Sequence, residues 1–251
     1  MRSFLIALQF LTIIPVRLKH VDEKKIADST AYFPLVGLLL GLILTGADRF
    51  LSFLGFEQFF ISVILVVLLI ILTGGIHLDG LADTADAFLS MKNKEETLRI
   101  MRDSRIGVMG VLSLISVILL KIAFLSCLGA QLKISTLLLM CILSRWAMVF
   151  SMFLFPYARV EGKAKDFIRG TDLKLFIFSS VITLFCVVKL CGIQGLALSL
   201  IIAAIVYVTG RLITNKIGGI TGDTLGATNE LVETGVLFGI CILERIGAWI
   251  I

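Results

Sequence analysis

The stretch TGGIHLDGLADTADAF, residues 73–88, decides how this chain is interpreted, because it follows a long apolar run and places three aspartates within eight positions. An apolar run of that length is typical of a helix that crosses a membrane. The aspartates therefore indicate where the chain leaves the hydrocarbon. The role of these carboxylates is the main indication of function in the sequence.

The composition predicts the class of protein. Hydrophobic residues make up 58% of the 251 residues and charged residues 16%, and the mean hydropathy is +1.04. Soluble domains are far less apolar, so we expect residues 1–251 to form a single integral membrane domain. The apolar runs are long rather than alternating, and a spanning segment must satisfy its own backbone hydrogen bonds. The expected fold is therefore all-α.

The order of apolar runs predicts a polytopic membrane helix bundle with about seven transmembrane helices. A short run from Phe4 to Ile14 is too short to cross and is halted by Pro15, so we expect an interfacial or re-entrant segment. Arg2 makes this run similar to a signal peptide, but no small-residue cleavage pattern follows and cleavage is not expected. The seven spans are predicted at residues 31–50, 58–76, 106–128, 133–156, 174–190, 193–213 and 231–251.

Basic residues predict the orientation, because short cytoplasmic loops accumulate lysine and arginine. With these spans, sixteen basic residues fall on one side, in residues 2–25, 92–105 and 159–174 and at Lys216. The other side has only Arg49, Lys133 and Lys189. The basic side is then cytoplasmic and the C-terminus lies outside. The net charge of +5 is mainly an orientation signal and does not indicate nucleic-acid binding.

If residues 79–88 are helical, Asp79, Asp83 and Asp86 are spaced i, i+4 and i+7 and project from one face. Like charges at this spacing repel, which favours a bound cation, and oxygen-only ligands favour Mg²⁺ or Mn²⁺ over zinc. The alternative is a solvated loop helix whose acids face water. The following MRDSRIGVMG, with Arg102, Asp103 and Arg105, makes a phosphate ligand the better interpretation.

A second acidic and glycine-rich block, GGITGDTLGATNELVE at residues 218–233, precedes the last predicted span on the same side. Asp223 and Glu230 are again seven residues apart, and Glu233 follows one turn later. Its glycines allow a backbone to approach a ligand closely, or serve as a hinge or loop. Neither the Walker A nor the Rossmann glycine pattern fits this block.

These blocks resemble the cobalamin synthase family, the adenosylcobinamide-GDP ribazoletransferases of corrinoid biosynthesis. The resemblance lies in HLDGLADTADAF, MRDSRIGVMG, PYAR at residues 156–159 and GGITGDTLGATNE. It extends nearly end to end, because LQFLTIIPV at 8–16 and AYFPLVGLLLG at 31–41 are also similar to that family. The family commonly carries an acidic residue at the position of Leu78, so either that position is not essential or Asp79 suffices.

The resemblance implies a phosphotransferase with Mg²⁺ as cofactor. A hydroxyl of α-ribazole, or of its 5′-phosphate, would attack adenosylcobinamide-GDP at the cobinamide-side phosphorus. GMP would leave, and adenosylcobalamin or its phosphate would form. The enzyme would lie in the prokaryotic cytoplasmic (inner) membrane with its active site facing the cytoplasm. Its partners would be these small molecules and the lipid bilayer, with no nucleic acid. A homo-oligomer or a complex with other corrinoid-pathway enzymes is also compatible with the resemblance.

Roles for single residues follow from phosphoryl transfer, which depends on positioning and on neutralising phosphate charge. One aspartate would also accept the proton of the attacking hydroxyl, with Asp86 preferred. His77 would bind metal, hydrogen-bond a phosphate or cap the helix end. The expected metal ligands are Asp79, Asp83, Asp86 and Asp223.

The expected substrate contacts are mostly arginines, whose guanidinium groups suit phosphate oxygens. For Arg102, Arg105 and Arg159 a role as a positive-inside anchor is the alternative. Arg145 lies mid-span and should face the bundle interior, paired with a phosphate or held in an internal salt bridge. The full substrate-binding set is Arg102, Asp103, Arg105, Arg145, Arg159, Asp223 and Glu230.

Two other classes of function compete with this one. A CDP-alcohol phosphotransferase or a polyprenyl transferase also uses aspartate-bound Mg²⁺ at a membrane face. The first normally has a single longer motif in which an arginine stands where this chain has Asp83, and the second needs two similar aspartate-rich helices. A cation-coupled transporter would instead carry its acids near mid-bilayer within broken spans, and no inverted repeat is visible in this chain.

Overall fold

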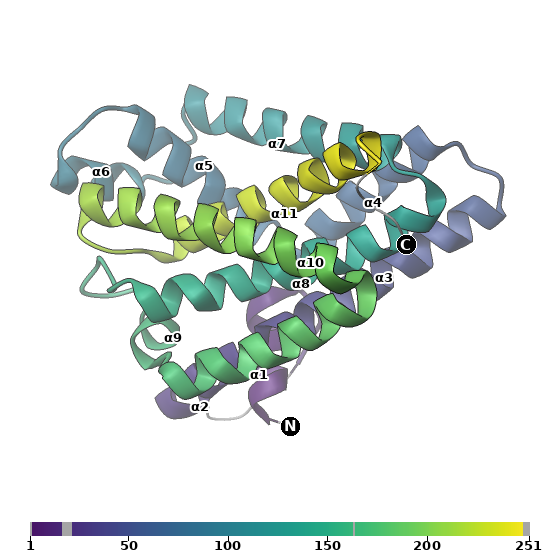
Figure 1. Cartoon of the computed structure of the whole chain (residues 1–251). Helices are drawn as coiled ribbons and strands as arrows, with labels where there is room; N and C mark the ends of the chain where they lie inside the picture. The colour runs from purple at the N-terminus through teal and green to yellow at the C-terminus, as the bar shows by residue number, and fades with distance from the viewer. Residues whose placement is uncertain (1, 17–21, 163, 248–251) are drawn as a thin grey trace.

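A computed structural model describes residues 2–16, 22–162 and 164–247 (Figure 1). The described residues form helices and contain no strand apart from an isolated backbone bridge between Tyr157 and Ile220. The prediction of an all-α helix bundle is confirmed. The elements are α1 Arg2–Leu11, α2 Glu23–Ser29, η1 Thr30–Tyr32, α3 Phe33–Phe53, α4 Gln58–Thr73, α5 Ile76–Leu89, α6 Lys94–Ile100, α7 Val108–Cys127, α8 Ala130–Leu154, α9 Lys165–Gly170, α10 Leu173–Ile217 and α11 Gly222–Arg245.

Five helices among the described residues are long and apolar enough to cross a membrane, and a sixth span results if α4 and α5 count as one broken span. One of the five is α10, whose 45 residues are interrupted at Gly192. A straight helix of that length would measure about 68 Å, roughly twice the hydrocarbon thickness. Figure 1 shows α10 turning back on itself. The break lies between the predicted spans 174–190 and 193–213, so the predicted count of about seven is approximate.

The last predicted span has the wrong start. The sequence suggested a membrane helix from residue 231, but α11 begins at Gly222. Thr221 forms a capping box with Thr224: each side chain hydrogen-bonds the other residue's backbone N–H. The glycine-rich block at 218–233 is therefore mostly helix, and Asp223 lies on its first turn. The end of this predicted span, residues 248–251, lies outside the described residues.

The N-terminal segment reaches into the bundle. After α1 ends, the backbone N–H of Ile13 donates to the carbonyl oxygen of Leu72 at 2.8 Å, near the end of α4. This contact ties the chain after α1 to the end of α4. Two of the basic residues used to predict orientation, Arg17 and Lys19, lie outside the described residues, as does Lys163.

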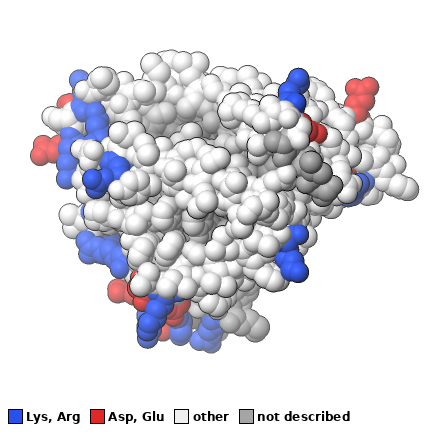
Figure 2. All heavy atoms as spheres, in the orientation of Figure 1, with Lys and Arg blue, Asp and Glu red and all other residues white. Residues whose placement is uncertain are grey.

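The core lies around α8, which is buried along most of its length between α3, α10 and α11. Charged side chains are concentrated elsewhere. In Figure 2 the blue and red side chains gather mainly over the end of the molecule that carries α2, α6 and α9, and the middle is almost uncharged. An uncharged middle is what contact with lipid hydrocarbon requires.

Candidate active site

The site is shaped first by the break between α4 and α5. Gly74 has φ 63° and Gly75 has φ 69°, which is the left-handed region where a side chain is strained. Two consecutive glycines in this conformation turn the chain by 91° from α4 into α5. On the first turn of α5, His77 is only 3% exposed whereas Asp79 is exposed.

The aspartates lie on a helix, as predicted, and two of them share a surface with Asp223. Asp79 is exposed, whereas Asp83 and Asp223 are partly buried. The carboxylates of Asp79 and Asp223 and the guanidinium of Arg159 lie close enough to Asp83 to act on its charge. We call Asp79, Asp83 and Asp223 the carboxylate surface. It holds three acids, and among the described residues the cation that acts on both Asp83 and Asp223 is Arg159, so the described charges there are mainly negative.

Asp86 has different contacts from the other two aspartates of α5. Its Oδ2 accepts the backbone N–H of Gly107 at 2.7 Å, and its Oδ1 accepts that of Gly110 at 2.8 Å. These N–H groups belong to the start of α7, where backbone donors have no partner within the helix. Asp86 therefore caps α7 from another helix and fixes α5 against it. The structure gives this carboxylate a tethering role that the sequence did not indicate.

The close packing of α5 on α11 places Asp223 beside the aspartates. A Cβ atom on Gly80 would lie 2.7 Å from the carbonyl oxygen of Asp223, and one on Gly226 would lie 3.0 Å from that of His77. The two backbones are therefore in direct contact: Gly80 leaves no room for a side chain, and Gly226 leaves very little. This contact brings together residues far apart in the chain.

Arg159 is the predicted phosphate-binding arginine that the structure brings to the carboxylate surface. Its Nη2 lies 2.8 Å from Oδ2 of Asp223 and 3.5 Å from the carbonyl oxygen of Met101. The backbone pairing of Tyr157 with Ile220 holds the PYAR segment against the start of α11. Three segments thus converge here: the loop before α7, the loop after α8 and the first turn of α11.

Arg102, Asp103 and Arg105 lie in the exposed loop before α7 and line a separate cleft of about 380 Å³ together with Arg99. Arg105 donates to both oxygens of Asp103, at 3.1 Å from Nε and 2.9 Å from Nη2. These hydrogen bonds lower the pKa of Asp103 to about 2. Asp103 is therefore engaged with its neighbour, and the cleft presents mainly positive charge. Sequence reasoning had not included Arg99, whose position one turn before Arg102 could have suggested it.

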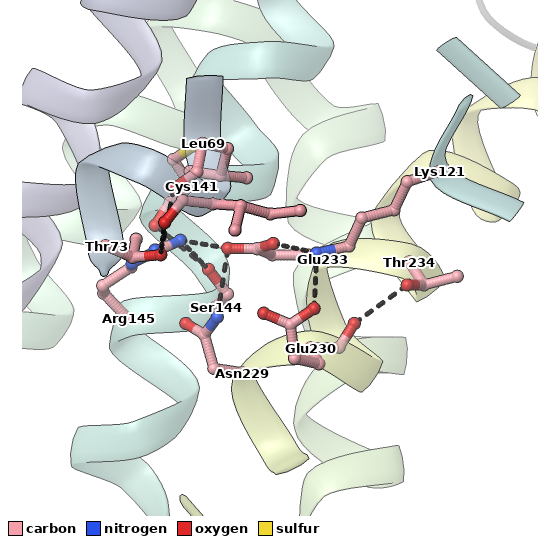
Figure 3. Close-up of polar contacts among 11 residues, drawn as sticks. Leu69, Thr73, Lys121, Cys141, Ser144, Arg145, Asn229, Glu230, Glu233 and Thr234 are labelled. Carbon is pink, nitrogen blue, oxygen red and sulfur yellow. Dashed lines mark hydrogen bonds and ion pairs between the residues drawn. The ribbon is translucent and has the colours of Figure 1, made fainter. Parts of the chain in front are cut away.

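Arg145 and Glu230, both predicted to bind substrate, lie instead in a buried network of charges (Figure 3). Nζ of Lys121 lies 2.7 Å from Oε2 of Glu230 and also pairs with Glu233. Glu233 pairs in turn with Arg145, which is fully buried. The structure thus favours the internal salt bridge that was the alternative for Arg145. It also supplies the partner of Lys121, a residue whose partner the sequence did not reveal.

His77 belongs to the side of α5 that faces this network. It is buried, its Nδ1 has no hydrogen-bond partner, and the charges acting on it are those of Arg145, Glu233 and Lys121. Leu78 lines a small apolar cavity beside Lys121 and Glu230. Neither side chain joins the carboxylate surface, so the structure separates His77 from Asp79 and Asp83.

The donor chemistry of the carboxylate surface fits Mg²⁺, but with fewer protein ligands than the four predicted. Among the described residues no three His, Cys, Asp or Glu side chains lie close enough together to hold a metal ion. Asp86 is occupied by backbone donors, and Asp223 pairs with Arg159. Mg²⁺ is usually bound by one or two carboxylates together with substrate phosphates. Asp79 and Asp83 are able to supply those carboxylates.

Comparisons with known proteins identify the family of the chain. A family model described as cobalamin-5-phosphate synthase matches residues 3–241. A relative named adenosylcobinamide-GDP ribazoletransferase, from Desulforamulus reducens, is 39% identical over 97% of this chain and 98% of its own length. Relatives of the same name from Roseiflexus sp. and Pseudomonas syringae are 40% and 36% identical, over 92% and 97% of this chain and 86% and 100% of their own lengths. No solved structure matches the chain.

Proposed function

From its membership of the cobalamin-5-phosphate synthase family, whose relatives are adenosylcobinamide-GDP ribazoletransferases, the chain is a transferase of cobalamin synthesis with that activity. We propose that its reaction takes place at the carboxylate surface of α5. The family match covers residues 3–241. It decides against a CDP-alcohol phosphotransferase, a polyprenyl transferase or a cation-coupled transporter.

In the proposed reaction, a hydroxyl oxygen of α-ribazole, or of its 5′-phosphate, forms a bond to the cobinamide-side phosphorus of adenosylcobinamide-GDP. The bond from that phosphorus to the oxygen of GMP breaks, and GMP leaves with the electron pair. The proton of the attacking hydroxyl passes to a carboxylate. We assign this proton to Asp83 rather than Asp86, because both oxygens of Asp86 already accept backbone N–H groups.

Arg159 would bind the diphosphate. Its Nη2 is held by Asp223 at 2.8 Å, and its buried Nε has no hydrogen-bond partner among the described residues. A phosphate oxygen at this guanidinium would gain a charge-assisted hydrogen bond and would be oriented beside Asp83. The exposed cleft of Arg99, Arg102 and Arg105 offers a second positive surface for the rest of the nucleotide.

Asp79 and Asp83 are the residues that would hold Mg²⁺, with Asp223 holding Arg159 beside them. When bound, the ion neutralises charge on the diphosphate and on the departing GMP oxygen. Support comes from an imbalance of charge around Asp83, where the carboxylates of Asp79, Asp223 and Asp86 face the guanidinium of Arg159. That imbalance is the observation on which the location of the site depends.

The side of the membrane follows from the distribution of basic residues. α6 and α9 carry Lys94, Arg99, Lys165 and Arg169 at the end of the molecule where most charges gather (Figure 2). Positive charge in short loops favours the cytoplasm. We therefore propose that the carboxylate surface opens to the cytoplasm from the inner membrane of a prokaryotic cell.

The direct test incubates the purified protein in detergent with adenosylcobinamide-GDP, α-ribazole and Mg²⁺, and quantifies GMP and adenosylcobalamin by mass spectrometry. We expect both products in equal amounts, loss of turnover with EDTA, and recovery with excess Mg²⁺. A parallel reaction with α-ribazole 5′-phosphate identifies the preferred acceptor. Formation of GMP without a cobalamin product, or turnover that persists in EDTA, would contradict the proposal.

A further inference from the structure

The buried charges of Figure 3 lie beneath the carboxylate surface without belonging to it. They come from three helices: Lys121 from α7, Arg145 from α8, and Glu230 and Glu233 from α11. Each is at most 5% exposed. Two cations face two carboxylates, so the network is neutral when all four are ionised. Glu233 is central, because its two oxygens pair with cations from different helices.

We propose that this network is a positioning device for the reaction proposed above: Lys121 and Arg145, by clamping Glu233, fix the depth and rotation of α11 and thereby align Asp223 with Asp79 and Asp83. The inference rests on the proposed function for its assay. None of the four charged residues is a catalytic residue in this account, because the network acts on His77 at the first turn of α5 and its members are not among the charges that act on Asp83.

The path from network to site is short and rigid. Glu233 lies ten residues after Asp223 on one continuous helix, about 15 Å along its axis. Between these two residues, Gly226 packs directly on the backbone of His77, and Gly80 packs on the backbone of Asp223. No side chain separates the two helices at these contacts. A shift of α11 is therefore transmitted to α5 or pulls Asp223 away from Asp83.

The anchoring is strong because the charges are buried. Removing one partner of a buried ion pair leaves the other uncompensated in a low-dielectric interior, and the structure must then move or admit water. Asn229 adds to the clamp by donating to Oε1 of Glu233 at 3.0 Å, and Ser144 accepts from Arg145 at 2.9 Å. The network thus restrains the very helix that carries Asp223.

A matched pair of single variants separates positioning from stability. Lys121→Met leaves the network with one excess negative charge. Lys133→Met likewise orphans a buried carboxylate, that of Asp48, whose Oδ1 lies 3.0 Å from Nζ of Lys133. Lys133 is on α8, about 18 Å along the helix from Arg145, and none of its partners lies on α5 or α11. Both variants should lower the melting temperature.

The measured quantities are KM and kcat, with kcat calculated per molecule of folded, monodisperse protein. We expect Lys121→Met to lower kcat by about 100-fold with KM for adenosylcobinamide-GDP near the wild-type value, since small misplacements of reacting groups cost rates of this order. Lys133→Met should keep the wild-type kcat. The double variant Lys121→Met with Glu230→Gln restores neutrality and retains the pair of Glu233 with Arg145 but still lacks the clamp from α7, so it should recover part of the lost kcat.

Wild-type-like kcat in Lys121→Met, or an equal fall in Lys133→Met, would overturn the inference, as would a double variant no better than the single one. Should Lys121→Met fail to fold, Glu230→Gln takes its place, with a smaller fall in kcat expected and an unchanged kcat counting against the inference. A wild-type protein that forms no product contradicts the proposed function instead, so the two failures are distinguishable.

Discussion

Two groups of charges in this molecule lie beside the same helix, α5, and differ in balance. The buried network pairs Lys121 and Arg145 with Glu230 and Glu233, and its charges cancel. In the described part of the chain, the carboxylate surface sets Asp79, Asp83 and Asp223 against Arg159. Charges that support a fold inside a membrane must be paired. An uncompensated group at the same helix indicates a ligand that supplies the missing positive charge.

The largest effect of a single substitution is expected at Asp83 in the carboxylate surface. Asp83→Asn keeps the shape of the side chain but removes its charge and its capacity to accept a proton. We expect kcat to fall by about 1000-fold or more, which is typical when a general base is lost, with the protein still inserted and folded. The measurement is GMP release per folded molecule. Turnover close to wild type would place the reaction elsewhere.

Arg159 tests the cationic side of the carboxylate surface. Arg159→Lys keeps the charge but replaces the three nitrogens of the guanidinium by one. The single ammonium group is then less able to bind Asp223 and the diphosphate at the same time. Loss of one charge-assisted hydrogen bond corresponds to about 2 kcal/mol. We expect kcat/KM for adenosylcobinamide-GDP to fall by roughly 30-fold, mainly through KM. An unchanged KM would show that Arg159 serves only the ion pair with Asp223.

Asp86 tests whether an aspartate of α5 can serve the fold rather than the reaction, because its carboxylate binds backbone N–H groups at the start of α7. Asp86→Ala removes the acceptor for the N–H groups of Gly107 and Gly110 and should lower the free energy of unfolding by about 1 kcal/mol, as loss of a helix cap does. The melting temperature should fall while the folded variant retains most of its kcat. A fall in kcat as large as that of Asp83→Asn, at an unchanged melting temperature, would make Asp86 a ligand or base instead.

Local patterns in the sequence were enough to predict part of this arrangement. The i, i+4 and i+7 spacing placed Asp79, Asp83 and Asp86 on one helix, and α5 confirms the helix. The apolar runs predicted α3, α4, α7 and α8 to within a few residues. The start of α11 was missed, because GGITGDTLGATNE is rich in residues typical of loops, and the capping box of Thr221 and Thr224 was overlooked.

What the sequence did not reveal depends on partners distant in the chain. Asp86 binds N–H groups 21 and 24 residues away, and the partners of Lys121 lie 109 and 112 residues away. Spacing along a helix carries no information on which other helix faces it. Arg145 could be predicted to face the interior, but its pairing with Glu233 required the packing of α8 against α11.

The central claim is that the carboxylate surface, and Asp83 in particular, holds the divalent ion of the reaction. Mn²⁺ binding, followed by electron paramagnetic resonance with adenosylcobinamide-GDP present, tests it without turnover, in the wild type and in Asp83→Asn, with Lys133→Met as the control. We predict bound Mn²⁺ in the wild type and in Lys133→Met. In Asp83→Asn the affinity for Mn²⁺ should fall by at least about tenfold, because loss of an outer-shell residue already lowers metal affinity by about that factor and loss of a direct ligand should lower it no less. Equal Mn²⁺ binding in all three proteins would contradict the account.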